Sequence, residues 1–469
     1  MPWHLTITVD RDVDVPLTDQ IKSGIQRGIT EGALRPGTRL PSTRQLAIDL
    51  GVSRTVTLLA YEQLTAEGYL TALQGSGTRV AEAPAARVLK TPGRVEGKNA
   101  PVQWDLRIGR PDTANFPQRD WLVCYRRVLA GAAGGDLDVP PLGGAQNLQE
   151  TLAGYLGRIR GIRVTKESRL LVTSGVTQSV SAVCELLHAL GIRELAVEDP
   201  GHKSCWQTMR DAGIRPRPVP VDRHGLDVQA LSRMDVRAVL VTPTHQFPTG
   251  VALDSARREA LMRWADHDAR IVIEHDCGGE FWYERRTQQT ALQPLLPERV
   301  IYIGCVGGSL LPGIRIGWLA LPAWLLPLVK KPWSRWEFGP DPLTQLAFAE
   351  MVGSGLFDRH VRRLRSRYRE RQEAVQEAVR HYLPQCAMLG ATSGRTLYVE
   401  LPAAVDEAVL VESARHRSVL VQGGSHFHFD GTSRSPALVL GYQNLPRTGI
   451  RASVSAIREA LDEQMRAVG

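Results

Sequence analysis

Residues 300–322, VIYIGCVGGSLLPGIRIGWLALP, decide the fold of the larger part of the chain. The two ends, VIYIGC and IGWLALP, are short apolar runs rich in β-branched and aromatic residues, which is typical of buried strands. Between them stand Gly307 and Gly308, followed by the turn-forming pair Pro312 and Gly313. The stretch therefore predicts two strands that are joined by a glycine-rich loop.

Strand-like runs of this kind alternate with helix-like segments from Trp104 onward. The other runs are RLLVTSG, ELAVEDP, AVLVTP and RIVIEHD, and segments such as ARREALMRWADHD separate them. This alternation predicts βαβ units and an α/β fold with a mostly parallel sheet. After about residue 340 two helix-like segments lead into a smaller α+β segment at the C-terminal end.

The N-terminal part of the chain has the pattern of a winged helix-turn-helix. Ser42 and Ser53 stand at the N-cap positions of two predicted helices, and Gly51 supplies the stop between them. Two short helices joined by Gly-Val-Ser are typical of a helix-turn-helix. The strands around Gly75 and Gly77 predict the wing.

The second helix of such a motif enters the major groove of DNA, and residues near its start reach bases and phosphates. Arginines and hydroxyls suit both kinds of contact, and glycines in the wing allow close approach to the backbone. The candidate DNA-binding residues are Arg39, Ser42, Thr43, Arg44, Ser53, Arg54, Thr55, Thr57, Gly75, Ser76, Gly77 and Thr78. The net charge of +8 also favours a polyanionic partner, although this signal is weak by itself.

Length and composition predict an ordinary globular protein of several domains. The chain has 469 residues, of which 43% are hydrophobic and 23% charged. We expect a DNA-binding domain at 10–82, a linker at 83–103 and a large domain at 104–469. The sequence has no apolar run of roughly 18 residues and no leader-like start, so we expect a cytoplasmic protein without a membrane partner. Six scattered cysteines lack the spacing of a zinc ribbon or a disulfide framework.

Two stretches carry a resemblance to known families. ALRPGTRLPSTRQLAIDLGVSRTVTLLAYEQLTAEGYLTALQGSGTRV resembles the winged helix of GntR-type bacterial transcription regulators. VTSGVTQ, VEDPGH, VTPTHQFPTG, RIVIEHDCGGEFWY and the opening stretch resemble, in order and spacing, a fold-type I aminotransferase domain. The combination resembles the MocR subfamily, which implies double-stranded operator DNA as a partner, a homodimer with a head-to-tail arrangement, and pyridoxal phosphate (PLP) as the usual cofactor.

The sequence departs from this resemblance where PLP is bound. The family's Ser-Lys pair, whose lysine amine links covalently to PLP, aligns with Gly307 and Gly308. The aspartate that faces the ring nitrogen aligns with His275, and the tyrosine that faces the phenolic oxygen aligns with Cys277. Because several parts of one site differ together, we predict that PLP is not bound and that the chain has no cofactor.

The predicted function is therefore a non-enzymatic, PLP-independent DNA-binding regulator. Its aminotransferase-like domain is expected to provide dimerisation and a pocket for an unknown small-molecule effector. The predicted pocket residues are His202, His275, Cys277, Gly307, Gly308 and Arg315. Lys203 is weighed as another anchor for the cofactor, but a solvated lysine is the preferred interpretation.

Three alternatives stay open at this point. The first is a regulator or aminotransferase that holds PLP without a covalent bond. The second is a haem or metal sensor that uses histidines and cysteines on the segments converging on the pocket, although ordinary packing is the favoured interpretation of them. These residues are His202, Cys205, His275, Cys277 and Cys305. The third is a dimerisation scaffold without any ligand.

Overall fold

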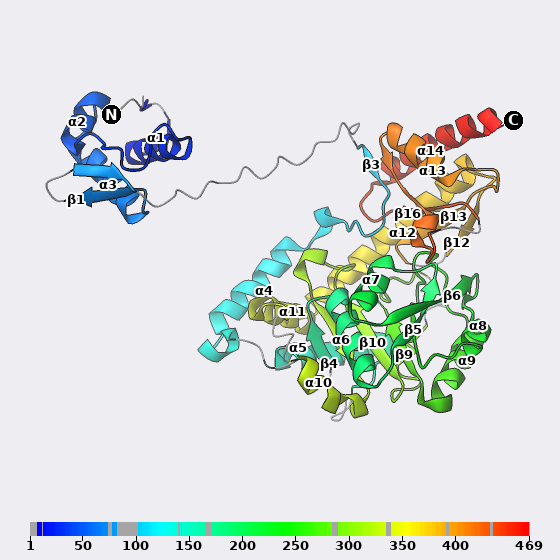
Figure 1. The fold of residues 1–469 in the computed structure, drawn as a ribbon. Helices are drawn as coiled ribbons and strands as arrows, with labels where there is room; N and C mark the ends of the chain where they lie inside the picture. Colours follow the sequence, from blue (N-terminus) through cyan, green and yellow to red (C-terminus); the bar gives the residue numbers. More distant parts are fainter. Residues whose placement is uncertain are drawn as a thin grey trace. The chain divides into compact units, whose positions relative to one another are not determined.

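The computed structural model separates the chain into two compact units, residues 1–99 and residues 100–469 (Figure 1). The structure describes residues 7–11, 13–73, 77–81, 102–138, 141, 143–164, 170–276, 278–283, 289–333, 339–390, 394–431 and 435–468. The two units are described separately. Within the described residues, none of the helices is both long enough and apolar enough to cross a membrane.

The N-terminal unit is a small helical module with a two-stranded hairpin. Its elements are α1 (Leu17–Thr30), α2 (Thr43–Leu50), α3 (Arg54–Ala66), β1 (Leu70–Leu73) and β2 (Gly77–Val80). The strands pair antiparallel, with Leu70 opposite Val80. Because the helix-turn-helix and wing are present as expected, this part of the predicted fold class is confirmed.

Local capping fixes the ends of α2 and α3. The Ser42 hydroxyl oxygen accepts a hydrogen bond from the Gln45 amide, and the Ser53 hydroxyl oxygen accepts one from the Val56 amide. Gly51 ends α2 in the left-handed region with φ of 64°, which favours glycine. The core of the unit is formed by buried apolar side chains from all three helices and the hairpin. These residues include Ile21, Ile25, Leu46, Ala60, Leu64, Leu70 and Val80.

The large unit is built on an eight-stranded sheet in the order β4-β11-β10-β9-β8-β5-β6-β7. Its strands are β4 (Leu170–Thr173), β5 (Glu194–Asp199), β6 (Arg215–Asp222), β7 (Gly225–Leu226), β8 (Ala238–Val241), β9 (Ile271–His275), β10 (Val300–Cys305) and β11 (Gly317–Ala320). The neighbours from β10 through β6 are parallel, while β11 runs antiparallel to both β10 and β4. The opening stretch thus forms two paired strands, β10 and β11, and the predicted mostly parallel sheet is confirmed.

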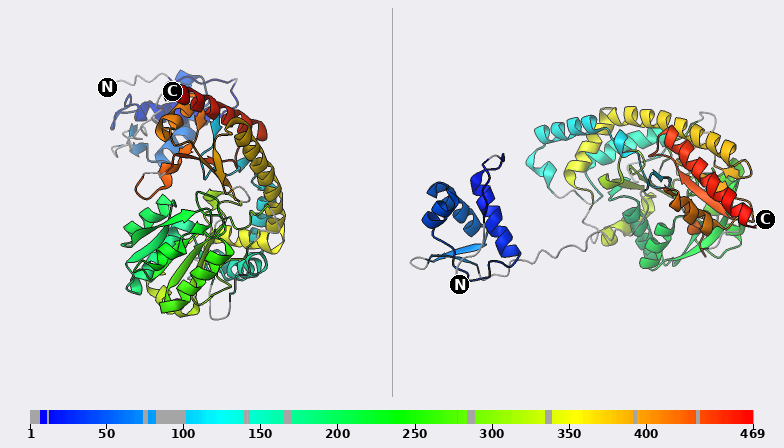
Figure 2. Two further views of the ribbon diagram at one scale, coloured as in Figure 1. Left: turned by 90° about the vertical axis from the view of Figure 1, so that its right-hand side faces the viewer. Right: turned by 90° about the horizontal axis from the view of Figure 1, so that it is seen from above.

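Helices cover both faces of this sheet (Figures 1 and 2). The helices of the large unit are α4 (Gln118–Gly131), α5 (Gln146–Arg160), α6 (Val176–Ala189), α7 (Lys203–Asp211), α8 (Val228–Ser232), α9 (Ser255–Asp266), α10 (Leu326–Trp333), α11 (Pro342–Gly353), α12 (Leu356–Tyr382), α13 (Glu407–His416) and α14 (Arg447–Val468). Ile271 and Ile273 of β9 pack in one cluster with α6, α7 and α10. Val272 packs in another cluster with α8 and α9 on the opposite face, as the two-residue period of a strand requires.

A smaller C-terminal part packs beside the large sheet. Its four-stranded sheet has the order β12-β13-β16-β15, formed by Ala387–Leu389, Thr396–Glu400, Ala437–Gly441 and Gln422–Gly423. A short parallel pair joins β14 (Val419–Leu420) to β3 (Trp104–Asp105). Helix α12 connects the two parts: Phe357 packs in a core with the large sheet, and Val379 packs in a core with α14 (Figure 2).

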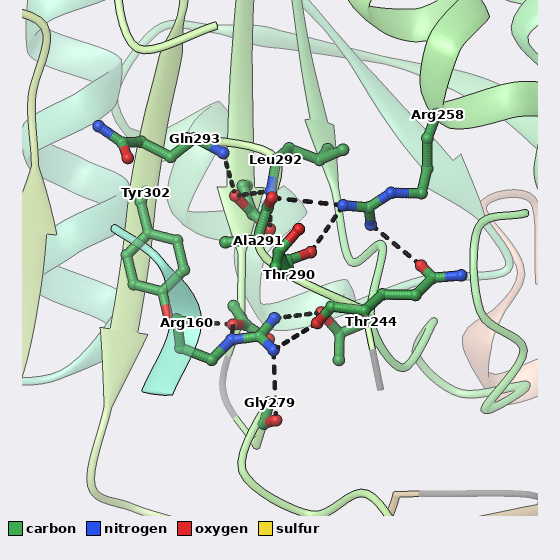
Figure 3. Close-up of polar contacts among 12 residues, drawn as sticks. Arg160, Thr244, Arg258, Gly279, Thr290, Ala291, Leu292, Gln293 and Tyr302 are labelled. Atoms are coloured by element: carbon green, nitrogen blue, oxygen red, sulfur yellow. Dashed lines mark hydrogen bonds and ion pairs between the residues drawn. The ribbon is translucent and has the colours of Figure 1, made fainter. Parts of the chain in front are cut away.

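A buried ion pair holds the carboxyl end of β9. The Arg160 guanidinium, at the end of α5, donates from Nε to Asp276 Oδ2 at 2.7 Å, and both side chains are at most 2% exposed. The same guanidinium donates to the Thr244 hydroxyl at 2.8 Å (Figure 3). Tyr302 of β10 donates to Asp276 at 2.9 Å. Burial acts to raise the pKa of Asp276, but the Arg160 charge outweighs it and the net pKa is lowered, so the carboxylate stays ionised.

Removal of one partner of this pair leaves a buried charge without compensation. We therefore expect Arg160→Ala to lower the free energy of unfolding by about 3–5 kcal/mol. The matched control is Arg158→Ala, which removes an exposed ion pair to Asp358 at 2.8 Å and should cost about 0–1 kcal/mol. Urea unfolding followed by tryptophan fluorescence measures both variants, since all tryptophans except Trp3 lie in the large unit. Equal costs for the two variants would contradict this assignment.

Candidate functional sites: a DNA-binding surface and a cavity at the sheet edge

The candidate DNA-binding residues gather around the starts of α2 and α3. Arg39, Ser42 and Arg44 are exposed around α2, and Ser53, Arg54 and Thr55 are exposed at the start of α3. Thr43 and Thr78 are partly exposed, and Gly77 is exposed at the start of β2. The Arg39 guanidinium lies against Gly77, where an added Cβ would be 3.1 Å from Nε. The starts of α2 and α3 therefore both present exposed arginines and hydroxyls, which suit contacts with bases and phosphates.

Thr57 is a correction to the predicted surface. Its side chain is fully buried, and its hydroxyl donates to the backbone oxygens of Thr43 at 2.8 Å and Arg54 at 2.9 Å. The prediction that Thr57 contacts DNA is wrong, because this hydroxyl ties α2 to α3 inside the module. Gly75 and Ser76 lie outside the described residues.

The large unit holds a cavity of about 550 Å³ at the carboxyl ends of its parallel strands. The segments that follow β5, β8, β9 and β10 all contribute to its lining, together with the first turn of α6 and the start of β13. Open parallel sheets bind ligands at this edge, where loops from several strands converge. The cavity is therefore the candidate ligand site of the large unit.

Four of the six predicted pocket residues line this cavity: His202, His275, Gly307 and Gly308. The prediction that Arg315 lines it is wrong, because the residue is exposed at the end of a short turn with φ of 53° and is absent from the lining. Cys277 lies outside the described residues. Lys203, which was weighed as an anchor, does line the cavity at the start of α7 and is partly buried.

Arg395 is the main pocket residue that sequence reasoning missed. It follows Gly394 immediately before β13, and its guanidinium lies against the glycine loop after β10. A Cβ atom added to Gly308 would be 1.8 Å from Arg395 Nη1, so the guanidinium fills the space that a side chain at position 308 would enter. Its Cζ also lies 5.9 Å from the centre of the Phe281 ring. No local pattern in the sequence indicated this approach, because only the fold brings the two segments together.

The neighbouring glycine is different. A Cβ atom added to Gly307 would be 3.8 Å from Cys305 Sγ and 3.9 Å from Pro312 Cα, which are ordinary contact distances. Neither Gly307 nor Gly308 is among the residues with positive φ. Packing against Arg395 therefore restricts position 308, whereas position 307 has room for a small side chain.

The cavity contains neutral histidines beside positive charges. Burial lowers the pKa of His202 to about 3 and that of His275 to about 4, so both imidazoles are neutral near pH 7. The His202 ring stacks on Phe247 with ring centres 3.6 Å apart and an angle of 11°. The charged side chains of the lining are Lys203, Asp276 and Arg395, and Arg160 neutralises Asp276. Two of the three charged side chains in the described lining are therefore cationic, and the buried Glu280 carboxyl lies within electrostatic reach of Arg395.

The first turn of α6 forms one wall. Val176 and Thr177 line the cavity directly after Gly175, whose φ is 91°. The first amides of a helix have no partner within the helix and lie at the positive end of its dipole. This wall is therefore suited to a phosphate or a carboxylate. A metal is a separate question: within the described residues, no group of three or more His, Cys, Asp or Glu side chains is arranged to hold one.

Comparison with known proteins identifies both units. The family described as "Aminotransferase class I and II" matches residues 102–438, and "Bacterial regulatory proteins, gntR family" matches residues 17–80. The pyridoxine biosynthesis regulator PdxR of Corynebacterium glutamicum is 31% identical over 98% of each chain. The probable rhizopine catabolism regulatory protein MocR of Rhizobium meliloti is 29% identical over 97% of this chain and 95% of its own.

Solved structures share the fold of the large unit. The kynurenine aminotransferase of Pyrococcus horikoshii, in complex with PMP, has a TM-score of 0.72 at 22% identity and covers 78% of this chain and 92% of its own. The α-aminoadipate aminotransferase LysN of Thermus thermophilus, complexed with N-(5'-phosphopyridoxyl)-L-leucine, has a TM-score of 0.68 at 23% identity. The match covers 77% of this chain and 93% of LysN.

These comparisons correct one prediction. The sequence predicted no cofactor, but the large unit matches a family and a fold whose solved structures include complexes with phosphorylated pyridine groups. The prediction of no cofactor is therefore wrong, and a group of the PLP type is what this domain implies. The glycine at position 308 and the histidine at position 275 then determine which contacts such a group can make.

The residues of the cavity fit part of such a group. The first turn of α6 suits its phosphate, and the stacked His202 and Phe247 offer an aromatic wall for its ring. Covalent attachment does not fit at position 308, because glycine has no amine and Arg395 fills the space beside it. The cavity therefore suits a ligand of this type that is held without a covalent bond at position 308.

The contact between Gly308 and Arg395 can be tested by mutation, and the neighbouring Gly307 provides the control. We expect Gly308→Ala to cost up to about 1 kcal/mol of unfolding free energy, because only the far end of the flexible Arg395 side chain has to move, and Gly307→Ala to stay within about 0.5 kcal/mol. In an Arg395→Ala background the cost of Gly308→Ala should largely disappear, since neighbouring residues couple in a double-mutant cycle. Equal effects of Gly308→Ala in both backgrounds would exclude the contact.

Proposed function

Because the chain belongs to the GntR-type bacterial regulators that carry an aminotransferase class I and II domain, we propose that it is a transcription regulator controlled by a reversibly bound ligand. The winged helix binds double-stranded operator DNA. The large unit binds a phosphorylated pyridine of the PLP type in the cavity. The observation that carries the proposal is a ligand-sized cavity at the sheet edge, in a chain that matches named regulators along nearly its whole length.

The ligand is held by this chain's own residues without a covalent link. The amides at the start of α6 bind the phosphate, and His202, backed by Phe247, packs against the ring. When bound, a group of this type supplies an electrophilic carbonyl on an electron-withdrawing ring. The name of the relative PdxR, a pyridoxine biosynthesis regulator, supports this ligand class.

The chain is not an aminotransferase in this proposal. Transamination by such a group needs a lysine amine that holds the cofactor and moves a proton. Gly308 supplies no amine, and a guanidinium such as that of Arg395 beside it does not take the place of one. In this proposal the domain therefore binds the ligand and transmits its presence to the DNA-binding unit, but it does not catalyse transamination.

The regulator acts as a homodimer in a head-to-tail arrangement. Exposed leucines on α4 support such an interface. Leu122 is 50% exposed and Leu129 is 56% exposed, and the two residues lie two helical turns apart on the same face of the helix. Together they form an apolar surface that a second chain could cover. Two chains would present two winged helices to two half-sites, which suits an operator with repeated sequence.

The proposed DNA-binding role predicts which arginine substitutions weaken binding to duplex DNA. Arg44→Ala and Arg54→Ala should each weaken binding to duplexes selected from a random-sequence pool by roughly 5- to 100-fold, because each removes a phosphate or base contact. Arg27→Ala, an exposed arginine in the last turn of α1, is the matched control and should change affinity by less than about 2-fold. Fluorescence anisotropy at fixed salt measures all three. If Arg27→Ala matches the other two, charge alone governs binding and the proposed surface is wrong.

The proposed dimer predicts that charges introduced on α4 dissociate it into monomers. The double variant Leu122→Glu, Leu129→Glu places two charges in the proposed interface, so we expect it to sediment as a monomer at concentrations where the unchanged chain is a dimer. Leu295→Glu is the control, since Leu295 is 54% exposed and belongs to the turn before β10 rather than to α4. Analytical ultracentrifugation distinguishes the species. A double variant that remains dimeric would remove α4 from the interface.

A further inference from the structure

Helix α3 of the N-terminal unit carries two exposed leucines that do not belong to the core of the unit. Leu58 is 41% exposed and Leu59 is 45% exposed. The same helix contributes other side chains to the core, among them Ala60 and Leu64. Single apolar residues on a surface are ordinary, so the position of this adjacent pair on the helix decides what it indicates.

The two leucines lie on the same face of α3 as the candidate DNA-binding residues at its start. Leu58 follows Arg54 by four residues, which places the two on one side of the helix. Leu59 follows Thr55 at the same spacing, and both Arg54 and Thr55 are exposed. The opposite side contains Thr57, whose hydroxyl is tied to α2. The leucines therefore extend the surface that a helix-turn-helix places in the major groove.

The exposed face of α3 offers few polar groups to DNA after its first turn. Beyond Arg54 the helix contains no lysine or arginine, so this part of the face provides no cation for phosphates. Glu62, one turn after Leu58, is an exposed carboxylate that phosphates repel. Backbone contacts therefore do not account for the two leucines.

Base edges offer one group that matches a leucine. A leucine side chain forms no hydrogen bond, so it can recognise a base only through apolar contact. The C5 methyl group of thymine is an apolar group that points into the major groove, and it distinguishes thymine from the other bases there. Thymine is therefore the base whose edge suits this face of α3.

We propose that Leu58 and Leu59 bind the C5 methyl groups of thymines in the major groove of the operator. This inference rests on the proposed function, because it takes double-stranded operator DNA as the partner from there. It assigns the two leucines to the choice of base, while the arginines at the starts of α2 and α3 contribute contacts that hold the duplex.

The experiment removes single methyl groups from the DNA. Duplexes are selected from a random-sequence pool with the full-length chain, and each thymine of the selected site is then replaced in turn by deoxyuridine, which lacks only the methyl group. Burial of one methyl group corresponds to about a 4-fold change in affinity, so we expect a penalty of this size at the thymines that the leucines contact. Fluorescence anisotropy at fixed salt measures it.

Substitutions in the protein then assign the penalty to the leucines. Leu58→Ala and Leu59→Ala should each abolish the penalty at their own thymine, because contacting groups couple in a double-mutant cycle. Each variant should still bind the corresponding deoxyuridine duplex within about 2-fold of the unchanged chain, which also shows that it is folded. Ile48→Ala is the matched control and should keep the full penalty, since Ile48 is 66% exposed in the same unit but lies on α2, the helix that crosses the DNA backbone.

Three outcomes would overturn the inference while leaving the DNA-binding role intact. The first is a selected site in which no thymine shows a methyl penalty. The second is a penalty that persists in both leucine variants or disappears in Ile48→Ala as well. The third is a pair of leucine variants that alter the sedimentation of the dimer without altering the penalty, which would indicate that a second chain covers this face. A selection that yields no bound duplex would instead reject the proposed DNA-binding role itself.

Discussion

The buried ion pair between Arg160 and Asp276 is the constraint on which the pocket depends. It joins the end of α5 to the residue just after β9, and Tyr302 and Thr244 add contacts from β10 and from the segment after β8. Four segments that are far apart in the sequence are thereby fixed at one edge of the sheet. An uncompensated charge at this depth would cost several kcal/mol, so these segments cannot separate independently.

This pair also fixes the wall of the cavity at the end of β9. His275 and Asp276 both line the cavity, and the Asp276 carboxylate is held there by its ion pair with Arg160. Glu274, on the same side as Asp276, accepts hydrogen bonds from the amides of Leu292 and Gln293. Glu274 and Asp276 thus both have structural partners, and His275 beside them presents a neutral imidazole to the cavity.

Sequence patterns predicted the features that depend on neighbours along the chain. The caps at Ser42 and Ser53 and the stop at Gly51 follow from local hydrogen bonding and backbone conformation, and the structure confirms all three. The strand-like runs likewise predicted the sheet, because short apolar runs that alternate with helical segments are typical of the buried strands of an α/β fold.

Features that depend on distant segments could not be predicted in this way. Helical spacing did not tell which side of α3 carries Thr57, because that depends on how α2 packs against it. The order of motifs identified position 308 but not its neighbour Arg395, which only the folded chain brings within contact. The expectation of no cofactor was wrong for a related reason: it relied on several residues of one site that differ together, whereas the cavity and the helix start at α6 are present without them.

A glycine at position 308 is physically consistent with the regulatory function that we propose. A ligand shifts an equilibrium only through its different affinity for two states, and its occupancy reports a concentration only when it exchanges with solution. A cofactor linked to lysine stays bound over a wide range of free concentrations, so its occupancy carries little information. In the function we propose, a ligand held without a covalent bond exchanges with solution, so its occupancy follows the free concentration around the dissociation constant. The proposed regulator therefore needs the pocket of the aminotransferase fold and not its reaction.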